Sequence, residues 1–114
     1  MIRGKRIITL EDFNRLVDLI GPVGIKQKNA LHTDQLFKVL QDAEQVNQHE
    51  IDKDIITMNS KALLRSLSNG RQAELTLTYP LDADPIKSRI SVLSHIGIAL
   101  IGSKSGDVVT WKTP

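Results

Sequence analysis

The sequence contains residue types that often act in catalysis or metal binding, but not at the spacings that these functions require. The histidines are isolated, so no HxH, HxxxH or HExxH arrangement places two imidazole nitrogens on one metal ion. There is no cysteine, which excludes thiolate metal sites, cysteine nucleophiles and disulfides. No GxSxG motif surrounds a serine, so a hydrolase triad has no sequence support. We expect no catalytic residue and no metal site, and we interpret the three histidines as solvated or locally structural: His32, His49 and His95.

A pair of carboxylates, Asp82 and Asp84, lies between Pro80 and Pro85. Such a pair could contribute oxygen ligands to a divalent cation, but a cation-binding loop needs several more oxygen ligands at regular spacing. A solvated acidic loop is therefore the favoured interpretation. No glycine-rich phosphate-binding loop occurs in the chain, and we expect no cofactor.

The composition is that of an ordinary folded domain. The chain has 114 residues, of which 40% are hydrophobic and 25% are charged, which suits one core with a small helical appendage. The formal net charge is only +2 and evenly spread, which argues against direct sequence-specific nucleic-acid binding. No apolar stretch approaches the roughly 20 residues of a membrane-spanning helix, and no secretory signal is evident. We expect a cytoplasmic protein that does not bind membranes.

Hydrophobic periodicity predicts the elements of the first half of the chain. Thr9 has the form of a helix N-cap after a short strand, and the helix that follows should end before Gly21. A connection covers residues 21–33, and Thr33 or Asp34 should cap a second helix. The two helices should pair antiparallel through apolar residues spaced three and four apart: Leu10, Phe13, Leu16, Val17 and Ile20 in the first, and Leu36, Phe37, Leu40, Ala43 and Val46 in the second.

At about residue 52 the spacing of the apolar residues changes from every three or four positions, typical of a helix, to every second position, typical of a strand. We therefore divide the chain into a short helical hairpin, residues 1–51, and a second part, residues 52–114. The Asn69-Gly70 pair predicts a β-hairpin. The predicted fold class is α+β, in which the helical hairpin precedes a small antiparallel sheet with one short helix. That helix is expected at residues 96–101, and strands are expected at residues 55–58, 62–67, 73–79, 90–92 and 108–111.

Residues 89–114 resemble the signature of the C-terminal domain of the GreA/GreB transcription factors. In that family an Ile-Ser-Val strand leads through a turn into a short helix ending in Leu-Ile-Gly, and a Gly-Asp-Val-Val strand follows. The same runs stand here at residues 90–92, 100–102 and 106–109. Residues 55–60 and 77–80 are similar to the Rnk-like (regulator of nucleoside diphosphate kinase) branch, whose coiled coil is short.

The resemblance implies an FKBP-like fold for residues 52–114 and binding to RNA polymerase near its secondary channel. Cleavage-stimulating members of the family reach down that channel with a long coiled coil, whose acidic tip helps to hold a catalytic magnesium ion. Here a helix of about 12 residues would span only about 18 Å, and residues 21–33 contain no Asp or Glu. The resemblance therefore implies a non-enzymatic regulator that competes with Gre factors without stimulating transcript cleavage. Five residues are the candidates for contacting the polymerase: Tyr79, Asp82, Asp84, Ser94 and His95.

Two departures from the family pattern have structural consequences. His95 stands where the family commonly has proline, and the chain stops at Pro114 where relatives continue into one more strand. The second departure predicts an open sheet edge through which a homodimer could form. The alternative function is an FKBP-like peptidyl-prolyl isomerase or another peptide-binding module. Isomerase sites rely on clustered aromatic side chains, and only Tyr79 and Trp111 lie in residues 52–114.

Overall fold

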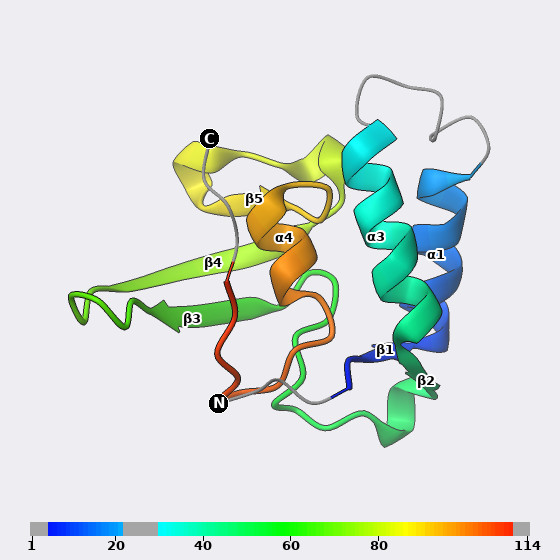
Figure 1. The fold of residues 1–114 in the computed structure, drawn as a ribbon, viewed down its shortest axis with the longest axis horizontal. Helices are drawn as coiled ribbons and strands as arrows, with labels where there is room; N and C mark the ends of the chain where they lie inside the picture. Colours follow the sequence, from blue (N-terminus) through cyan, green and yellow to red (C-terminus); the bar gives the residue numbers. More distant parts are fainter. Residues whose placement is uncertain (1–4, 22–29, 111–114) are drawn as a thin grey trace.

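A computed structural model of the chain describes residues 5–21 and 30–110, with side chains from residue 33 in the second range. These residues form a mixture of helices and sheets, so the α+β class is confirmed in this general form (Figure 1). The strands and helices are, in chain order, β1 (Ile7–Thr9), α1 (Leu10–Ile20), α3 (Ala30–Asp42), β2 (Glu44–Val46), β3 (Lys61–Arg65), β4 (Gln72–Thr78), β5 (Arg89–Ser91) and α4 (His95–Leu100). Short 3-10 turns occur at η1 (Gln48–Glu50), η2 (Pro80–Asp82) and η3 (Pro85–Lys87).

Helix α1 begins and ends where the sequence predicts. The Thr9 hydroxyl accepts a hydrogen bond from the Asp12 backbone N–H at 3.1 Å, which satisfies one of the donors that a helix start leaves open. Glu11 and Asp12 place negative charge in the first turn, where the helix dipole favours it. At the other end, the Gly21 N–H donates to the Val17 carbonyl at 2.9 Å.

Helix α3 starts earlier than predicted. It begins at Ala30, so the expected cap at Thr33 or Asp34 is wrong. Thr33 is buried and lies inside the helix. Figure 1 shows α3 beside α1 and running in the opposite direction, as the apolar spacing predicts. The connection before Ala30 lies mostly outside the described residues. No helix in residues 5–21 and 30–110 is long and apolar enough to cross a bilayer.

A small parallel sheet joins the two ends of the helical segment. β1 pairs with β2 so that Ile8 lies opposite Gln45, and the two helices form the crossover between these strands. The Ile7 N–H also donates to the Gly102 carbonyl at 3.1 Å, which ties β1 to the end of α4. β2 was not predicted, because its single apolar side chain, Val46, gives no period of two. The prediction that Val46 extends the second helix is wrong, since α3 ends at Asp42.

The β3–β4 hairpin confirms the prediction from the Asn69-Gly70 pair. The strands are antiparallel, with Leu63 opposite Glu74. Gly70 has a φ of 72°, a left-handed conformation that glycine adopts without steric cost. The Asn69 side chain accepts a hydrogen bond from the Arg71 N–H at 2.9 Å.

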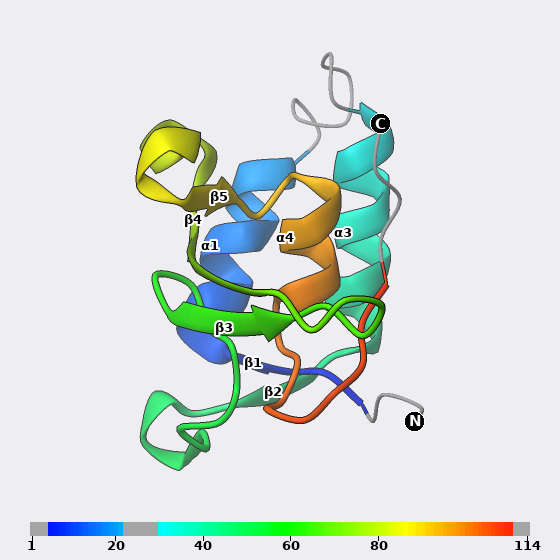
Figure 2. The ribbon, with the colours of Figure 1, turned by 90° about the vertical axis from the view of Figure 1, so that its left-hand side faces the viewer.

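The sheet is mixed rather than antiparallel, which corrects one part of the predicted architecture. β5 pairs parallel to β4, with Leu77 opposite Ile90. The reason is the connection between them, because the chain turns back through η2 and η3 before it re-enters the sheet beside β4 (Figure 2). Whether two neighbouring strands pair parallel or antiparallel depends on the path of the loop that connects them. The alternation of apolar residues along a strand does not predict it.

Two predicted strands are wrong for the described residues. Residues 55–58 form no strand. Ile55 makes an isolated bridge with Lys104, the Ile56 backbone hydrogen-bonds to Gly102 and Ser103, and a turn is held by the Ser60 hydroxyl, which contacts both the backbone N–H and the hydroxyl of Thr57. Residues 107–110 are assigned to no strand, and Trp111 lies outside the described residues. The apolar residues that suggested these strands contribute to packing instead, since Ile55 and Met58 are both buried.

The core is shared by both halves of the chain. Helix α4 lies between the helix pair and the β3–β4 hairpin (Figure 1). Its Leu100 packs with Ala62 and Leu75 of the hairpin. Its other side joins a larger cluster that combines α1 and α3 with the sheet: Ile8, Leu16, Ile20, Leu36, Leu40, Met58, Leu77, Val92, Ile98 and Ile101. The Arg6 guanidinium adds a polar tie by donating to the carbonyls of Ile98 and Ile101.

Candidate functional site

The loop between β4 and β5, residues 79–88, has a folded backbone of its own. The Asp82 N–H donates to the Tyr79 carbonyl at 3.0 Å, which closes η2. Asp84 and Arg89 exchange two backbone hydrogen bonds of 2.9 and 3.0 Å, which close the base of η3. A proline begins each 3-10 turn, where its fixed φ angle suits the turn. The loop is therefore a defined platform at the end of the sheet.

Two large aliphatic side chains on this platform are almost completely exposed. Leu81 is 99% exposed and Ile86 is 96% exposed. A single exposed leucine needs no explanation, but two such side chains on one short, hydrogen-bonded loop form a candidate contact surface. Two acidic residues of this loop were predicted to contact a partner, but Leu81 and Ile86 were not. Each is a lone aliphatic residue beside a proline, so hydrophobic periodicity gives no signal for it.

The two carboxylates of the loop have different surroundings. Asp82 is exposed, next to Leu81. Asp84 is half-buried, and its Oδ1 accepts a hydrogen bond from the Ile86 N–H at 3.2 Å, so this side chain caps η3 and orients Ile86. Among the described residues, no group of three or more His, Cys, Asp or Glu side chains is placed to hold a metal ion.

Ser94 and His95 lie at the start of α4. The Ser94 hydroxyl accepts a hydrogen bond from the Gly97 N–H at 3.0 Å and donates one to the Ser91 carbonyl at 2.6 Å. Ser94 is thus the N-cap of α4, and its polar groups are used within the fold. His95 is the first residue of the helix and is half-buried.

Tyr79 is directed toward α1 rather than toward the exposed loop. It packs against the main core cluster, and its hydroxyl oxygen is buried without a hydrogen-bond partner. Burial raises the pKa of Tyr79, the negative charge of Asp12 raises it further, and Arg15 opposes both effects. The structure therefore separates Tyr79 from the exposed side chains of Leu81 and Ile86.

Asp12 connects α1 to the second half of the chain. Its Oδ2 accepts a hydrogen bond from the Met58 backbone N–H at 3.1 Å. Burial raises the pKa of Asp12, although the hydrogen bonds from Met58 and Thr9 oppose this shift. The contact fixes how the helix pair is mounted on the sheet, and no local sequence pattern predicts a contact between residues so far apart.

The fold and the sequence together define the class of this protein. Residues 51–114 match the family "Transcription elongation factor, GreA/GreB, C-term", and the chain belongs to this family. A solved structure, the prokaryotic transcription elongation factor GreA/GreB from Nitrosomonas europaea, is similar with a TM-score of 0.79 and 34% sequence identity. The similarity covers 98% of this chain and 88% of that chain.

Two curated relatives place the chain within the family. Regulator of nucleoside diphosphate kinase of Escherichia coli (strain K12) is 35% identical over 81 residues, which are 71% of this chain and 60% of the relative. Transcription elongation factor GreA of Clostridium botulinum (strain Eklund 17B / Type B) is 36% identical over 80 residues, which are 70% of this chain and 50% of the relative. The chain thus matches between half and 60% of the length of these relatives. The predicted resemblance to the GreA/GreB family and to its Rnk-like branch is confirmed.

Proposed function

We propose that this protein is a non-enzymatic, cytoplasmic transcription regulator that docks on RNA polymerase near its secondary channel. It competes there with Gre factors and does not stimulate transcript cleavage. The proposal includes an FKBP-like description of residues 52–114 and a short helical hairpin in residues 1–51. Its family membership supports the partner, because a transcription elongation factor is among its relatives.

The observation that carries the docking proposal is the exposure of Leu81 and Ile86. Burying two large aliphatic side chains contributes about 1.5–3 kcal/mol each, which is enough to anchor an interface. Asp82 lies between them in the loop and is also exposed. The complementary surface on the polymerase is therefore an apolar patch beside a basic side chain. Ser94 and Asp84 support this surface by fixing α4 and η3, and His95 lies beside Ser94.

Two features of the helical hairpin support the absence of cleavage stimulation: the short length of its helices and the lack of acidic residues between them. Helix α1 has 11 residues and α3 has 13, which gives lengths of about 16 and 20 Å. Such helices are too short for a deep channel. Residues 21–29, which connect them, contain no Asp or Glu, and magnesium binding at a tip would require carboxylate oxygens.

The test is a pull-down of core RNA polymerase by the tagged protein, repeated with excess GreA as a competitor. We expect binding that GreA abolishes, together with no acceleration of cleavage in a backtracked complex. Binding that GreA leaves unchanged would contradict a shared site. Accelerated cleavage would contradict the regulatory mechanism while leaving the docking intact.

A further inference from the structure

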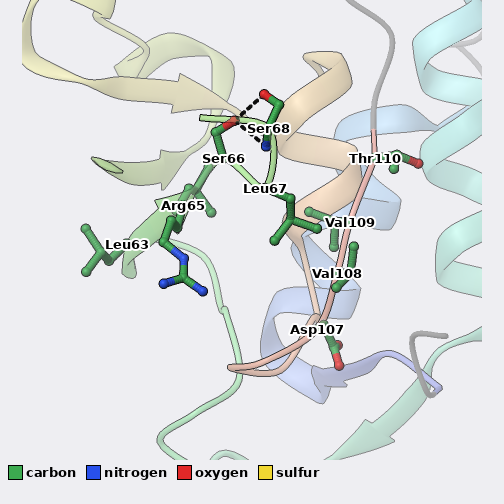
Figure 3. A pocket seen from close by; sticks show the side chains of 10 residues that line it. Leu63, Arg65, Ser66, Leu67, Ser68, Asp107, Val108, Val109 and Thr110 are labelled. Carbon is green, nitrogen blue, oxygen red and sulfur yellow. Dashed lines mark hydrogen bonds between the residues drawn. The ribbon is translucent and has the colours of Figure 1, made fainter. Parts of the chain in front are cut away.

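Two of the clefts in the described part of the chain differ in the character of their walls. The cleft between β3 and residues 107–110 is mainly apolar, and Figure 3 shows its Leu67 side chain directed toward Val108 and Val109. The other cleft, of about 350 Å³, is mainly polar and lies where α1, η1 and the turn at residues 57–59 meet. The polar side chains that line it include Glu11, Asp12, Arg15, Gln48, Thr57 and Asn59.

Hydrogen bonds fix the walls of this polar cleft. The Asn59 N–H donates to the Leu77 carbonyl at 2.6 Å, and the Leu77 N–H donates to the Ser60 carbonyl at 3.0 Å, which ties the turn to β4. In η1, the Asn47 side chain donates to the Glu50 carboxylate at 2.9 Å. The cleft is therefore formed before a ligand binds, which reduces the entropy that binding would cost.

Asp12 is the carboxylate of this cleft that no cation balances. Glu11 forms an ion pair with Arg15 at 3.1 Å, whereas no ion pair to Asp12 occurs within the described residues. The carboxylate accepts a hydrogen bond from the Met58 N–H but is half-buried, and the loss of solvent is the main cause of its raised pKa. The two carboxylates and one guanidinium of the lining leave a net negative charge that a cation would neutralise.

Other polar groups around Asp12 also lack partners within the chain. The amide side chains of Gln48 and Asn59 line the cleft, and neither makes a hydrogen bond within the described residues. The Tyr79 hydroxyl is buried without a hydrogen-bond partner, and the charges of Asp12 and Arg15 both act on its pKa, so it lies close to them. Unsatisfied buried polar groups are rare in folded proteins, so the polar network at this junction is incomplete.

The lining selects a guanidinium as the ligand. A guanidinium is planar and carries five N–H donors in a fixed fork, so it can donate to a carboxylate and to neighbouring amide oxygens at once. A divalent metal ion is disfavoured, because no group of three or more His, Cys, Asp or Glu side chains occurs in the described residues. A volume of about 350 Å³ is at the small end of ligand pockets and suits the end of one long side chain.

We propose that this polar cleft binds an arginine side chain presented by a partner protein. The guanidinium of the partner donates to the Asp12 carboxylate and to the side-chain oxygens of Gln48 and Asn59, while Arg15 stays paired with Glu11. A charge-assisted hydrogen bond of this kind is roughly twice as strong as a neutral one. The cleft shares no lining residue with the loop at residues 79–88, so this inference is independent of the proposed polymerase docking.

The test is an NMR titration of the whole, nitrogen-15-labelled chain with Nα-acetyl-arginine amide and with Nα-acetyl-citrulline amide, which has nearly the same shape but no charge. We expect the arginine compound to shift the backbone amide signals of Met58 and Asn59 with a Kd of about 1–10 mM. The citrulline compound should bind about tenfold more weakly, because it makes no charge-assisted hydrogen bond.

Two variants identify the group that recognises the ligand. Asp12→Asn keeps an acceptor for the Met58 N–H but loses the charge, so it should weaken arginine binding about tenfold and remove the preference over citrulline. The matched control is Asp18→Asn, which changes an exposed carboxylate of α1 outside the cleft and should bind like the parent. Thermal unfolding of both variants checks that they are folded.

Three outcomes would overturn the proposal. The first is the absence of shifts at Met58 and Asn59 when the folded parent is titrated with the arginine compound to about 50 mM. The second is equal binding of the arginine and citrulline compounds to the parent. The third is a preference for arginine that Asp12→Asn leaves unchanged or that Asp18→Asn removes equally.

Discussion

Gly97 determines how closely α4 can approach β5, and replacing it with alanine should be strongly destabilising. A Cβ atom at this position would lie 2.1 Å from the Ser91 carbonyl oxygen and 2.8 Å from the Val92 Cα. Ordinary contacts are about 3.5 Å, so α4 would have to move by roughly 1 Å or more. The obstructing atoms belong to the backbone and cannot rotate away. Overpacking of this kind lowers the free energy of unfolding by about 3 kcal/mol, and the higher helix propensity of alanine raises it by about 1 kcal/mol. The net loss should be about 2 kcal/mol or more.

Urea unfolding followed by circular dichroism measures this loss directly. The matched control is Gly70→Ala, which has no atom within contact distance of the added carbon and pays only for its positive φ angle. That cost is about 1–2 kcal/mol. A drop of about 2 kcal/mol corresponds to a decrease in melting temperature of roughly 8 °C or more. If Gly97→Ala unfolded within 0.5 kcal/mol of the parent, a value near the usual scatter for neutral surface changes, the close α4–β5 packing would be refuted.

Two further substitutions test the polar contacts of the site. Ser94→Ala removes the cap of α4 and should lower the free energy of unfolding by about 1 kcal/mol, whereas Ser94→Thr should retain most of it in the same urea experiment. Asp12→Ala leaves the Met58 N–H unpaired and should cost about 1–3 kcal/mol, while Asp12→Asn keeps an acceptor. Because the pKa of Asp12 is raised in the folded protein, folding favours its protonated form, so the parent should lose stability relative to Asp12→Asn as pH rises from about 3 to 7. A parent that gains stability relative to Asp12→Asn over this range would contradict the burial of the carboxylate.

Local signals in the sequence predicted the local features of the fold. The Thr9 cap and the Asn69-Gly70 turn depend on side chains within a few residues of one another, and both are present. The short helix near residue 96 was also predicted, because its apolar run is bounded by clear turn residues. Family resemblance added the GreA/GreB family, which composition and periodicity alone do not indicate.

Features that depend on distant parts of the chain were missed. The parallel direction of β5 follows from the path of residues 79–88, and β2 exists because β1 lies beside it. The alternation after Gly70 continues to Tyr79, but the pattern does not show that the tyrosine hydroxyl is buried near Asp12. The exposure of Leu81 could not be predicted from the sequence either, since an aliphatic residue is normally interpreted as part of the core.

The most direct test of the docking claim is the affinity of purified core RNA polymerase for the parent protein and for Leu81→Ser/Ile86→Ser, measured by biolayer interferometry. Both side chains are exposed, so the double variant should unfold like the parent. Leu63→Ser, a matched change at an exposed leucine of β3, serves as the control. We expect the double variant to bind at least tenfold more weakly, because each anchor contributes about 1 kcal/mol or more, and the control to bind like the parent. Equal affinity of all three proteins, or no binding by the folded parent, would contradict the proposed docking surface.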